Sequence, residues 1–410
     1  MKTDVLTYLI LLLFFHKFNG QENIELTSFQ WKEDLRYLSK TIKENHKKPF
    51  NYTSAATFDY EVNNLHEQIP NLSPSQIAIE LVKIGALIGD GHTAVRPYSY
   101  FKFYPLTLFW FGDDLRVVRA GEEHQDILGH KVVAIDGIGI KSVKDKIDVL
   151  TPKNENNYFL KSWNQYWLVT ADALFNVGTA KSNSQATYTF EDNYGNRKEV
   201  TFSAISGIAY GETKWKIAYD AIPPFMFRTK PIWTRIEKDR KLLYINFISY
   251  PDWKGIRKIA KQTKKDIEEN DINTLVIDFR LNGGGDFKKG LHLIDAIEKT
   301  AIHKRGKVYV FTGRSTFSAA MVNALHFKER LNAFLLGEPP GARPNSYSES
   351  YVFHLPNSKI KASCAIEYYQ FQEVDAPEVL LDKIILPDFN MYKQGRDPLL
   401  EWVDNDINTD

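Results

Sequence analysis

The chain has 410 residues, which is long enough for two or three domains that each bury a core of their own. Its formal net charge is +1 and 25% of its residues are charged, so the bulk electrostatics suggest neither a nucleic-acid partner nor a polyanionic substrate. Cys364 is the only cysteine, which excludes an intramolecular disulfide. Its alternation with polar neighbours predicts a small buried side chain in a strand.

The N-terminus resembles a secretory signal. Lys2 precedes an apolar run, 5–15, that is too short to span a bilayer comfortably. We therefore predict a signal peptide at 1–20 and an exported protein that is periplasmic or secreted. Asp4 and the bulky Phe18 depart from the usual signal pattern, so an uncleaved anchor is the alternative, and it is the one route by which we expect membrane association.

A helical pattern follows from Ser28 to Gly89, where apolar residues recur at close to helical spacing. Ser73 and Pro74 suit the cap and first turn of a helix. That helix leads into the stretch "GDGHT", which ends at Thr93. We assign 25–99 to an N-terminal helical segment that carries this stretch.

Short strands separated by turn signals fill the region 100–205, which predicts a small β-rich domain. Its stretch "DILGHKVVAIDG" resembles a PDZ-type segment. A spacer module that grips no peptide is the alternative.

After a proline-rich break, strands and helices alternate through 225–405. The expected helices include one from about Lys254 to Asn270 and one from Ser318 to Leu331. Alternation of this kind predicts a mainly parallel sheet with helices on its faces, and hence an α/β fold class.

Two turns at predicted strand ends carry the chemistry. The first is the run of glycines at 283–285, whose backbone N–H groups can approach a ligand oxygen closely, as an oxyanion hole requires; a tight turn without a ligand is the alternative. The second contains Ser318, which would act as an N-cap if taken alone. A serine at a helix N-terminus beside a glycine turn is the minimum set for acyl transfer, so we interpret Ser318 as a nucleophile.

The ordered motifs "GDGHT", "VIDFRLNGGG", "STFSAA", "LLGEPPGARPNSYSE" and "LPDFNMYKQGRDPLLE" resemble those of the C-terminal-processing (tail-specific) serine peptidases and their tricorn-like relatives. The resemblance covers the chain from Ser28 to its end. It implies a crotonase/ClpP-like β/α catalytic core in an exported serine-type endopeptidase. Ser318 would be the nucleophile, and backbone N–H groups near Gly283, Gly284 and Ala319 would be the oxyanion donors.

The residue that would accept the proton of Ser318 differs from the one in the tail-specific peptidases. Arg343 stands where that branch has its lysine, and a guanidinium stays charged at any working pH. The tricorn-like branch is similar in taking a histidine from an N-terminal segment, which makes His92 the predicted general base. The alternative is that His92 only ties a turn together. Asp90 is interpreted as a cap or turn residue.

The third catalytic residue would be a carboxylate that orients the imidazole. The tricorn-like pattern maps loosely to Asp382, and Glu349 is its rival; either can instead be a surface charge. Asp278, Arg280 and Asn282 are interpreted as structural groups that hold the glycine turn.

We predict no metal site and no cofactor. The spacing of His46 and His66 matches no zinc pattern, and both are interpreted as helical surface histidines. The expected partner is a protein or peptide substrate. A non-catalytic protein that binds hydrophobic ligands or peptides on the same scaffold is the second hypothesis, and crotonase-type acyl chemistry with coenzyme A is a third.

Overall fold

The computed structural model describes residues 25–408 except 220, 222 and 227–229, so the predicted signal peptide lies outside the described residues. The described chain divides into two compact units. The C-terminal unit contains the described residues of Tyr219–Pro344 and Phe371–Asp410. The N-terminal unit contains the described residues up to Ala218, together with Asn345–Gln370. No described helix is long and apolar enough to cross a membrane.

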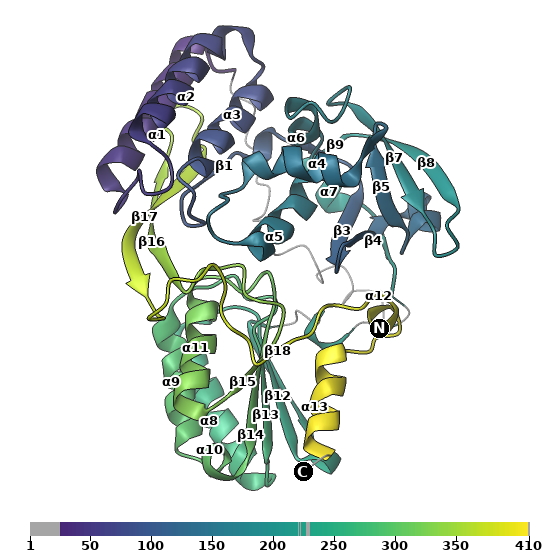
Figure 1. Ribbon diagram of the computed structural model, residues 1–410, viewed down its shortest axis with the longest axis vertical. Coiled ribbons are helices and arrows are strands. Elements are labelled where there is room, and N and C mark those ends of the chain that lie inside the picture. The colour runs from purple at the N-terminus through teal and green to yellow at the C-terminus, as the bar shows by residue number, and fades with distance from the viewer. Residues whose placement is uncertain (1–24, 220, 222, 227–229, 409–410) are drawn as a thin grey trace. The chain divides into compact units, whose positions relative to one another are not determined.

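The C-terminal unit is built on a six-stranded sheet (Figure 1). Its first strand is antiparallel to the second, and all the other neighbours are parallel. The strands, in spatial order, are β11 (Ile232–Glu237), β12 (Leu242–Phe247), β13 (Thr274–Asp278), β14 (Lys307–Thr312), β15 (Phe334–Gly337) and β18 (Lys383–Ile384). The predicted alternation of strands and helices is confirmed, as is the α/β fold class.

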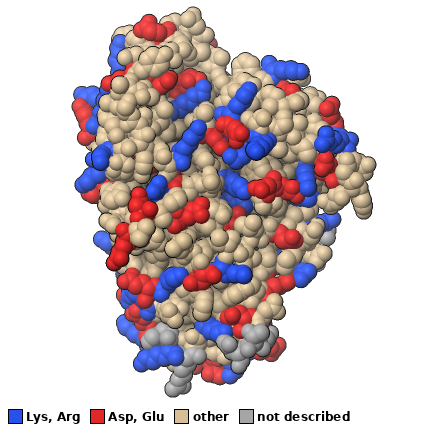
Figure 2. All heavy atoms as spheres, viewed as in Figure 1, with Lys and Arg blue, Asp and Glu red and all other residues tan. Residues whose placement is uncertain are grey.

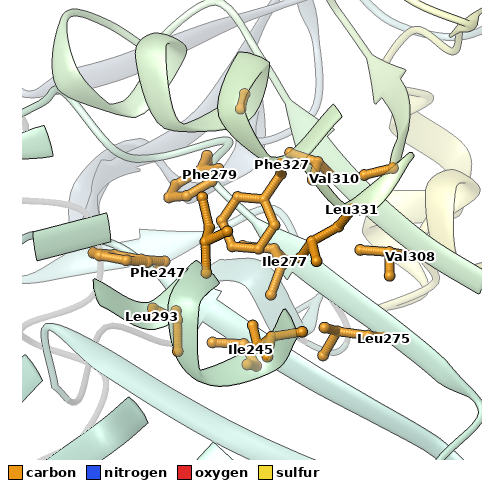
Figure 3. Packing of buried hydrophobic residues seen from close by; sticks show 14 of the residues in the cluster. Ile245, Phe247, Leu275, Ile277, Phe279, Leu293, Val308, Val310, Phe327 and Leu331 are labelled. Atoms are coloured by element: carbon orange, nitrogen blue, oxygen red, sulfur yellow. The ribbon is translucent and has the colours of Figure 1, made fainter. Parts of the chain in front are cut away.

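Helices cover both faces of this sheet, which explains why its central strands are almost continuously apolar. One face packs against α8 (Trp253–Glu269), α9 (Phe287–Glu298) and α11 (Ala319–Leu331), and the short α10 (Ile302–Arg305) lies on the same side. The other face packs against α13 (Pro398–Asn408), which follows α12 (Phe389–Lys393). In Figure 3, Phe327 of α11 lies among Phe279, Val310 and Leu331, with its ring 6.0 Å from that of Phe279.

The N-terminal unit begins with three helices, α1 (Ser28–Asn45), α2 (Ala55–Gln68) and α3 (Pro74–Ala86). Their N-caps are Thr27, Ser54 and Ser73, and each cap side chain accepts a hydrogen bond from a first-turn N–H. The helical pattern predicted between Ser28 and Gly89 is confirmed, including the cap at Ser73 and the proline in the first turn.

An antiparallel three-stranded sheet packs against these helices (Figure 1). Its order is β1 (Ala94–Arg96), β17 (Lys361–Gln370) and β16 (Asn345–His354). Cys364 of β17 is fully buried in the shared core, as predicted. The hairpin formed by β16 and β17 therefore belongs to the same unit as the "GDGHT" stretch.

The rest of the N-terminal unit is rich in short strands, as predicted. A seven-stranded sheet contains β3 (Leu106–Phe111), β4 (Asp114–Gly121), β5 (Lys131–Ile135), β6 (Ile138–Gly139), β7 (Gln185–Glu191), β8 (Arg197–Ser203) and β10 (Trp215–Ile217). A two-stranded sheet contains β2 (Lys102–Phe103) and β9 (Ile205–Ser206). The helices of this region are α4 (Ile140–Ile147), α5 (Asn157–Trp167), α6 (Ala171–Asn176) and α7 (Gly207–Glu212).

A buried ion-pair network anchors the end of β13 in the C-terminal unit. The Arg280 guanidinium donates to Asp278 Oδ2 at 2.6 Å and to Asp397 Oδ2 at 2.5 Å. The side chains of Arg280 and of both aspartates are at most 7% exposed. Tyr244 donates its hydroxyl to Asp278, and the guanidinium lies 4.0 Å from the centre of the Phe225 ring. The structural interpretation of Asp278 and Arg280 is confirmed.

Arg280→Leu is expected to lower the free energy of unfolding by about 3–5 kcal/mol, because two buried carboxylates lose their cation. Chemical denaturation followed by circular dichroism measures this change. Arg396→Leu is the matched control: it removes an exposed arginine that pairs with Glu401, and little change is expected. Equal effects from the two variants would contradict the importance of the buried network.

Candidate active site

Ser318 occupies a strained position between β14 and α11. Its φ is 51° and its ψ is −127°, a combination that residues other than glycine rarely adopt. It stands at the N-cap position of α11, but its side chain makes no capping hydrogen bond. The alternative interpretation of this serine as an ordinary N-cap is therefore wrong.

The turn before Ser318 is held by several hydrogen bonds. Thr316 Oγ1 donates to the carbonyl of Phe279 at 2.8 Å and accepts from the N–H of Gly313 at 2.9 Å. The N–H of Phe317 donates to the carbonyl of Asn282 at 3.0 Å. These bonds tie the serine turn to the segment that follows β13. Thr316 was not identified from the sequence, although a threonine two residues before a candidate nucleophile was the available signal.

The glycine turn lies directly against Ser318. Gly284 has a φ of 107°, and a Cβ placed on it would lie 2.8 Å from Ser318 Cβ and 3.0 Å from the carbonyl oxygen of Phe317. Asn282 Oδ1 accepts the N–H of Gly284 at 2.9 Å, while its amide nitrogen donates to the carbonyl of Phe247. The structural role predicted for Asn282 is confirmed, and the two predicted turns are brought together in the C-terminal unit.

Three backbone N–H groups were predicted as oxyanion donors. That of Gly284 already donates to Asn282. Within the described part of the chain, the N–H groups of Gly283 and Ala319 donate no hydrogen bond. The first turn of α11 also carries the positive end of its helix dipole. Of the three predicted donors, only Gly284 is thus already engaged within the described part of the chain.

His92 lies in the N-terminal unit, in the turn between α3 and β1. Asp90 Oδ1 accepts the backbone N–H groups of His92 at 3.1 Å and of Thr93 at 2.8 Å. Asp90 is thus the turn residue that was predicted. Its other oxygen, Oδ2, lies 2.9 Å from His46 Nε2, and both side chains are buried.

The prediction that His46 is a surface histidine is wrong, because its side chain is only 1% exposed. The N–H of Lys48 donates to His46 Nδ1 at 3.0 Å, which places the imidazole proton of a neutral ring on Nε2, facing Asp90. His46 therefore helps to hold the turn that carries His92. Periodicity alone gave no signal for this pair, since its members are 44 residues apart.

The half-buried His92 contacts the hairpin formed by β16 and β17. The ring nitrogen Nε2 of His92 lies 3.4 Å from Ser348 Oγ. The backbone carbonyl of His92 accepts a hydrogen bond from the Ser363 hydroxyl at 2.7 Å. Burial lowers the pKa of His92 to about 4. The charge of Asp90 and a hydrogen bond with the Tyr347 backbone both raise this pKa, but their effect is smaller than that of burial. The ring is therefore neutral at pH 7 and able to accept a proton.

The two predicted carboxylates lie in different units. Glu349 follows Ser348 in β16, is exposed, and accepts the hydroxyl of Tyr369 at 3.3 Å. Asp382 belongs to the C-terminal unit, where both of its oxygens lie within 2.9 Å of Lys328 Nζ and Oδ2 also accepts the N–H of Leu335.

Arg343 belongs to the C-terminal unit as well. It donates to Asp375 at 3.0 Å in a pair whose acidic member is exposed. This contact agrees with a structural role and gives no support to a role as base.

No protein-family model and no curated protein matches this chain. Among solved structures, mature CPAF complexed with lactacystin matches with a TM-score of 0.63 and 11% sequence identity, over 93% of this chain and 99% of that chain. A CPAF mutant matches with a TM-score of 0.64 and 11% identity, over 92% and 96% of the two chains. The chain has the CPAF fold. The resemblance to the C-terminal-processing peptidases is confirmed for the fold.

Gly284→Ala is expected to lower the free energy of unfolding by about 2–4 kcal/mol, because its Cβ would collide with Ser318 and the backbone needs a positive φ. Gly283→Ala is the control, since a Cβ there meets no atom within 4 Å. Thermal and chemical unfolding measure both. A Gly284→Ala protein as stable as Gly283→Ala would contradict the close approach of the two turns.

Proposed function

We propose that this protein is a serine peptidase that cleaves peptide bonds through an acyl-enzyme on Ser318, with His92 as general base. The observation that carries the proposal is the strained backbone of Ser318 at a strand-to-helix turn, with a glycine turn packed against it. Nucleophilic serines of hydrolases occupy turns of this kind, although the G-x-S-x-G motif is absent here. The CPAF fold is compatible with this function.

The positive φ of Ser318 supports the assignment because such strain persists only where the surroundings impose it. A serine whose sole purpose was to cap α11 would have an extended backbone and would accept an N–H of the first turn. Ser318 does neither. A role as nucleophile accounts for a backbone conformation that capping does not require.

In the proposed reaction, the Ser318 oxygen attacks the scissile carbonyl carbon while its proton moves to the His92 imidazole. The N–H groups of Gly283 and Ala319 stabilise the negative oxygen of the tetrahedral intermediate. The imidazolium then gives the proton to the departing amine, and the C–N bond breaks to leave an acyl-enzyme. Water hydrolyses this ester with His92 again acting as the base.

A carboxylate near the imidazole would stabilise the imidazolium. We propose Glu349 ahead of Asp382, because Glu349 adjoins Ser348, whose hydroxyl contacts the His92 ring. Both Asp382 oxygens are engaged by Lys328, and one also binds the Leu335 backbone.

The finer features of the fold and setting are part of the same proposal. The predicted catalytic region 225–405 would be a crotonase/ClpP-like core, apart from Asn345–Gln370, which belong to the N-terminal unit. The region 100–205 would be a PDZ-like domain that presents or gates a peptide end, and 1–20 would be a signal for export to a periplasmic or secreted location. The substrate would be a protein or peptide. Figure 2 shows basic and acidic side chains interspersed over the face in view, so charge of one sign does not dominate that face.

A fluorophosphonate probe tests the nucleophile and the base together. The wild type is expected to be labelled, whereas Ser318→Ala and His92→Gln are expected to lose labelling by 100-fold or more in rate. Intact mass spectrometry and peptide mapping measure the reaction and its site.

Ser315→Ala and His354→Gln are matched controls, since the first lies in the same turn and the second is exposed in β16. Both should label like the wild type. If the folded wild type does not react even with added peptide, the peptidase proposal fails and a binding protein on this scaffold becomes the better hypothesis. Labelling that survives in His92→Gln would mean that another base acts.

The pH dependence of kcat/KM tests the state of His92. Because only neutral imidazole accepts a proton, kcat/KM should fall on the acid side with a midpoint near the His92 pKa of about 4, and not near 6.5. Asp90 raises this pKa, so Asp90→Asn should move the midpoint to still lower pH. Peptide hydrolysis from about two pH units below the expected midpoint up to pH 8, with folding checked at each pH, measures it. A midpoint at 6.5 or above would show that a buried His92 is not the titrating group.

A further inference from the structure

We propose that the outer face of α8, together with the start of α9, binds an acidic segment of the peptide substrate at some distance from the cleaved bond. Both helices belong to the C-terminal unit, which also carries Ser318. The inference rests on the proposed peptidase function and adds a substrate class to it. Five exposed basic residues form this cationic face: Lys254, Arg257, Lys258, Lys261 and Lys288.

The side chains of the cationic face repel one another. Lys254 and Lys258 are four residues apart in α8, and so are Arg257 and Lys261. Like charges at this spacing lie on the same side of a helix and destabilise it. An anionic ligand that binds across the row would remove this repulsion, so the charges of the row are complementary to a run of carboxylates.

The cationic face lacks the acidic partners that the other half of α8 has. Within the described part of the chain, no ion pair or side-chain hydrogen bond forms to any of its five side chains. In the C-terminal half of the helix, by contrast, Lys264 pairs with Glu268 at 3.6 Å and Lys265 with Glu269 at 3.7 Å. The same helix therefore neutralises its lysines at one end and leaves them available at the other.

Two aspartates lie close to the cationic face in the sequence, and both serve as helix N-caps. Asp252 accepts the N–H of Gly255 at 2.7 Å, and Asp286 accepts the N–H of Lys288 at 3.1 Å. These bonds direct the carboxylates toward backbone donors at the helix starts. They do not pair with the basic side chains, so the face keeps its positive character.

The row of basic residues on α8 has the length of a short peptide segment. The buried residues of α8 include Ile256 and Ala260, and the basic side chains point away from that buried side. With a rise of about 1.5 Å per residue, the row from Lys254 to Lys261 is about 10 Å long. An extended peptide advances about 3.3 Å per residue, so about three consecutive acidic residues would match the row.

Contacts within the C-terminal unit place the start of α8 near the proposed nucleophile. Gly284 packs against Ser318, and a Cβ on the next residue, Gly285, would lie 2.6 Å from the side chain of Tyr250. Trp253, three residues after Tyr250, is the first residue of α8. The cationic face therefore begins close to the serine turn and extends from there along α8. A peptide bound at Ser318 would reach it after a few residues.

The start of α9 lies beside the start of α8, as Figure 1 also shows. Lys289 Nζ lies 5.9 Å from the centre of the Trp253 ring, and that ring lies 6.4 Å from the ring of His292. Lys288 is exposed in the same first turn as Lys289. It therefore adds a fifth positive charge at the end of the cationic face that lies nearest the serine turn.

Peptides that differ only in a flanking run test the cationic face. The central sequence is one that the wild type cleaves, selected from a random peptide library, and Glu-Glu-Glu or Gln-Gln-Gln is added on its N-terminal or its C-terminal side. The wild type is expected to favour the Glu flank on one side by about 10-fold or more in kcat/KM. The effect should lie mainly in KM, because the contact is remote from the reacting atoms, and it should weaken as salt screens the charges.

Two double variants separate the cationic face from the overall charge. Lys254→Gln combined with Lys258→Gln should reduce the preference for the Glu flank by about 5-fold or more. Lys264→Gln combined with Lys265→Gln lowers the net charge equally but removes lysines that already have partners, so it should keep the wild-type preference. Circular dichroism verifies folding, and if the first variant does not fold, Lys288→Gln decides in its place.

The outcomes separate this inference from the function on which it rests. Equal cleavage of both flanks by the wild type, or an unchanged preference in the folded Lys254→Gln, Lys258→Gln variant, overturns the acidic-segment surface while the peptidase proposal stands. Equal cleavage together with sedimentation on phosphatidylserine vesicles that this variant loses would assign the cationic face to an anionic membrane instead. A wild type that is neither labelled by the fluorophosphonate probe nor able to cleave any peptide overturns the peptidase proposal, and this inference with it.

Discussion

The close approach of two backbone turns, one after β13 and one after β14, is the constraint on which the proposed nucleophile depends. These strands are parallel neighbours with Asp278 paired to Phe311, so the segments that leave their carboxyl ends emerge side by side. The bond from Phe317 to the carbonyl of Asn282 then joins the two segments. A side chain at Gly284 would occupy the space of Ser318, so the serine can hold its position only if that residue is glycine.

The strain at Ser318 requires rigid surroundings, and several independent contacts of the C-terminal unit provide them. Thr316 fixes the turn before the serine, Asn282 fixes the glycine turn, and the Arg280 network fixes the end of β13. Each of these groups is buried, so each polar atom must find a partner inside the protein. The same hydrogen bonds that satisfy these buried groups therefore oppose relaxation of the serine to an ordinary φ.

Local sequence patterns were sufficient to predict the strands and helices of the C-terminal unit, the start of α3 and part of the candidate site. Apolar runs that end in glycine or small polar residues gave the parallel strands and the turns at their ends, and Ser73 with Pro74 gave the start of α3. Three features could not be predicted in this way. The pairing of Ala94 with Ser363 and the bond between His46 and Asp90 join distant segments, and local periodicity does not determine such pairs. The positive φ of Ser318 also leaves no trace in the sequence, because serine is common at ordinary helix N-caps.

If His92 is the base, as proposed, its environment explains why the reaction would need a further carboxylate. An imidazole whose pKa is about 4 is neutral at pH 7, but it is a weak base, and burial opposes the imidazolium that proton transfer creates. Asp90 offsets part of this effect, yet its oxygens already accept two backbone N–H groups and face His46. Those bonds stabilise its charge for the turn and leave it poorly placed to orient the ring. A second carboxylate that meets the imidazole directly would favour the charged form during the reaction without changing the neutral resting state, because substrate would exclude water and strengthen that interaction only when it is bound.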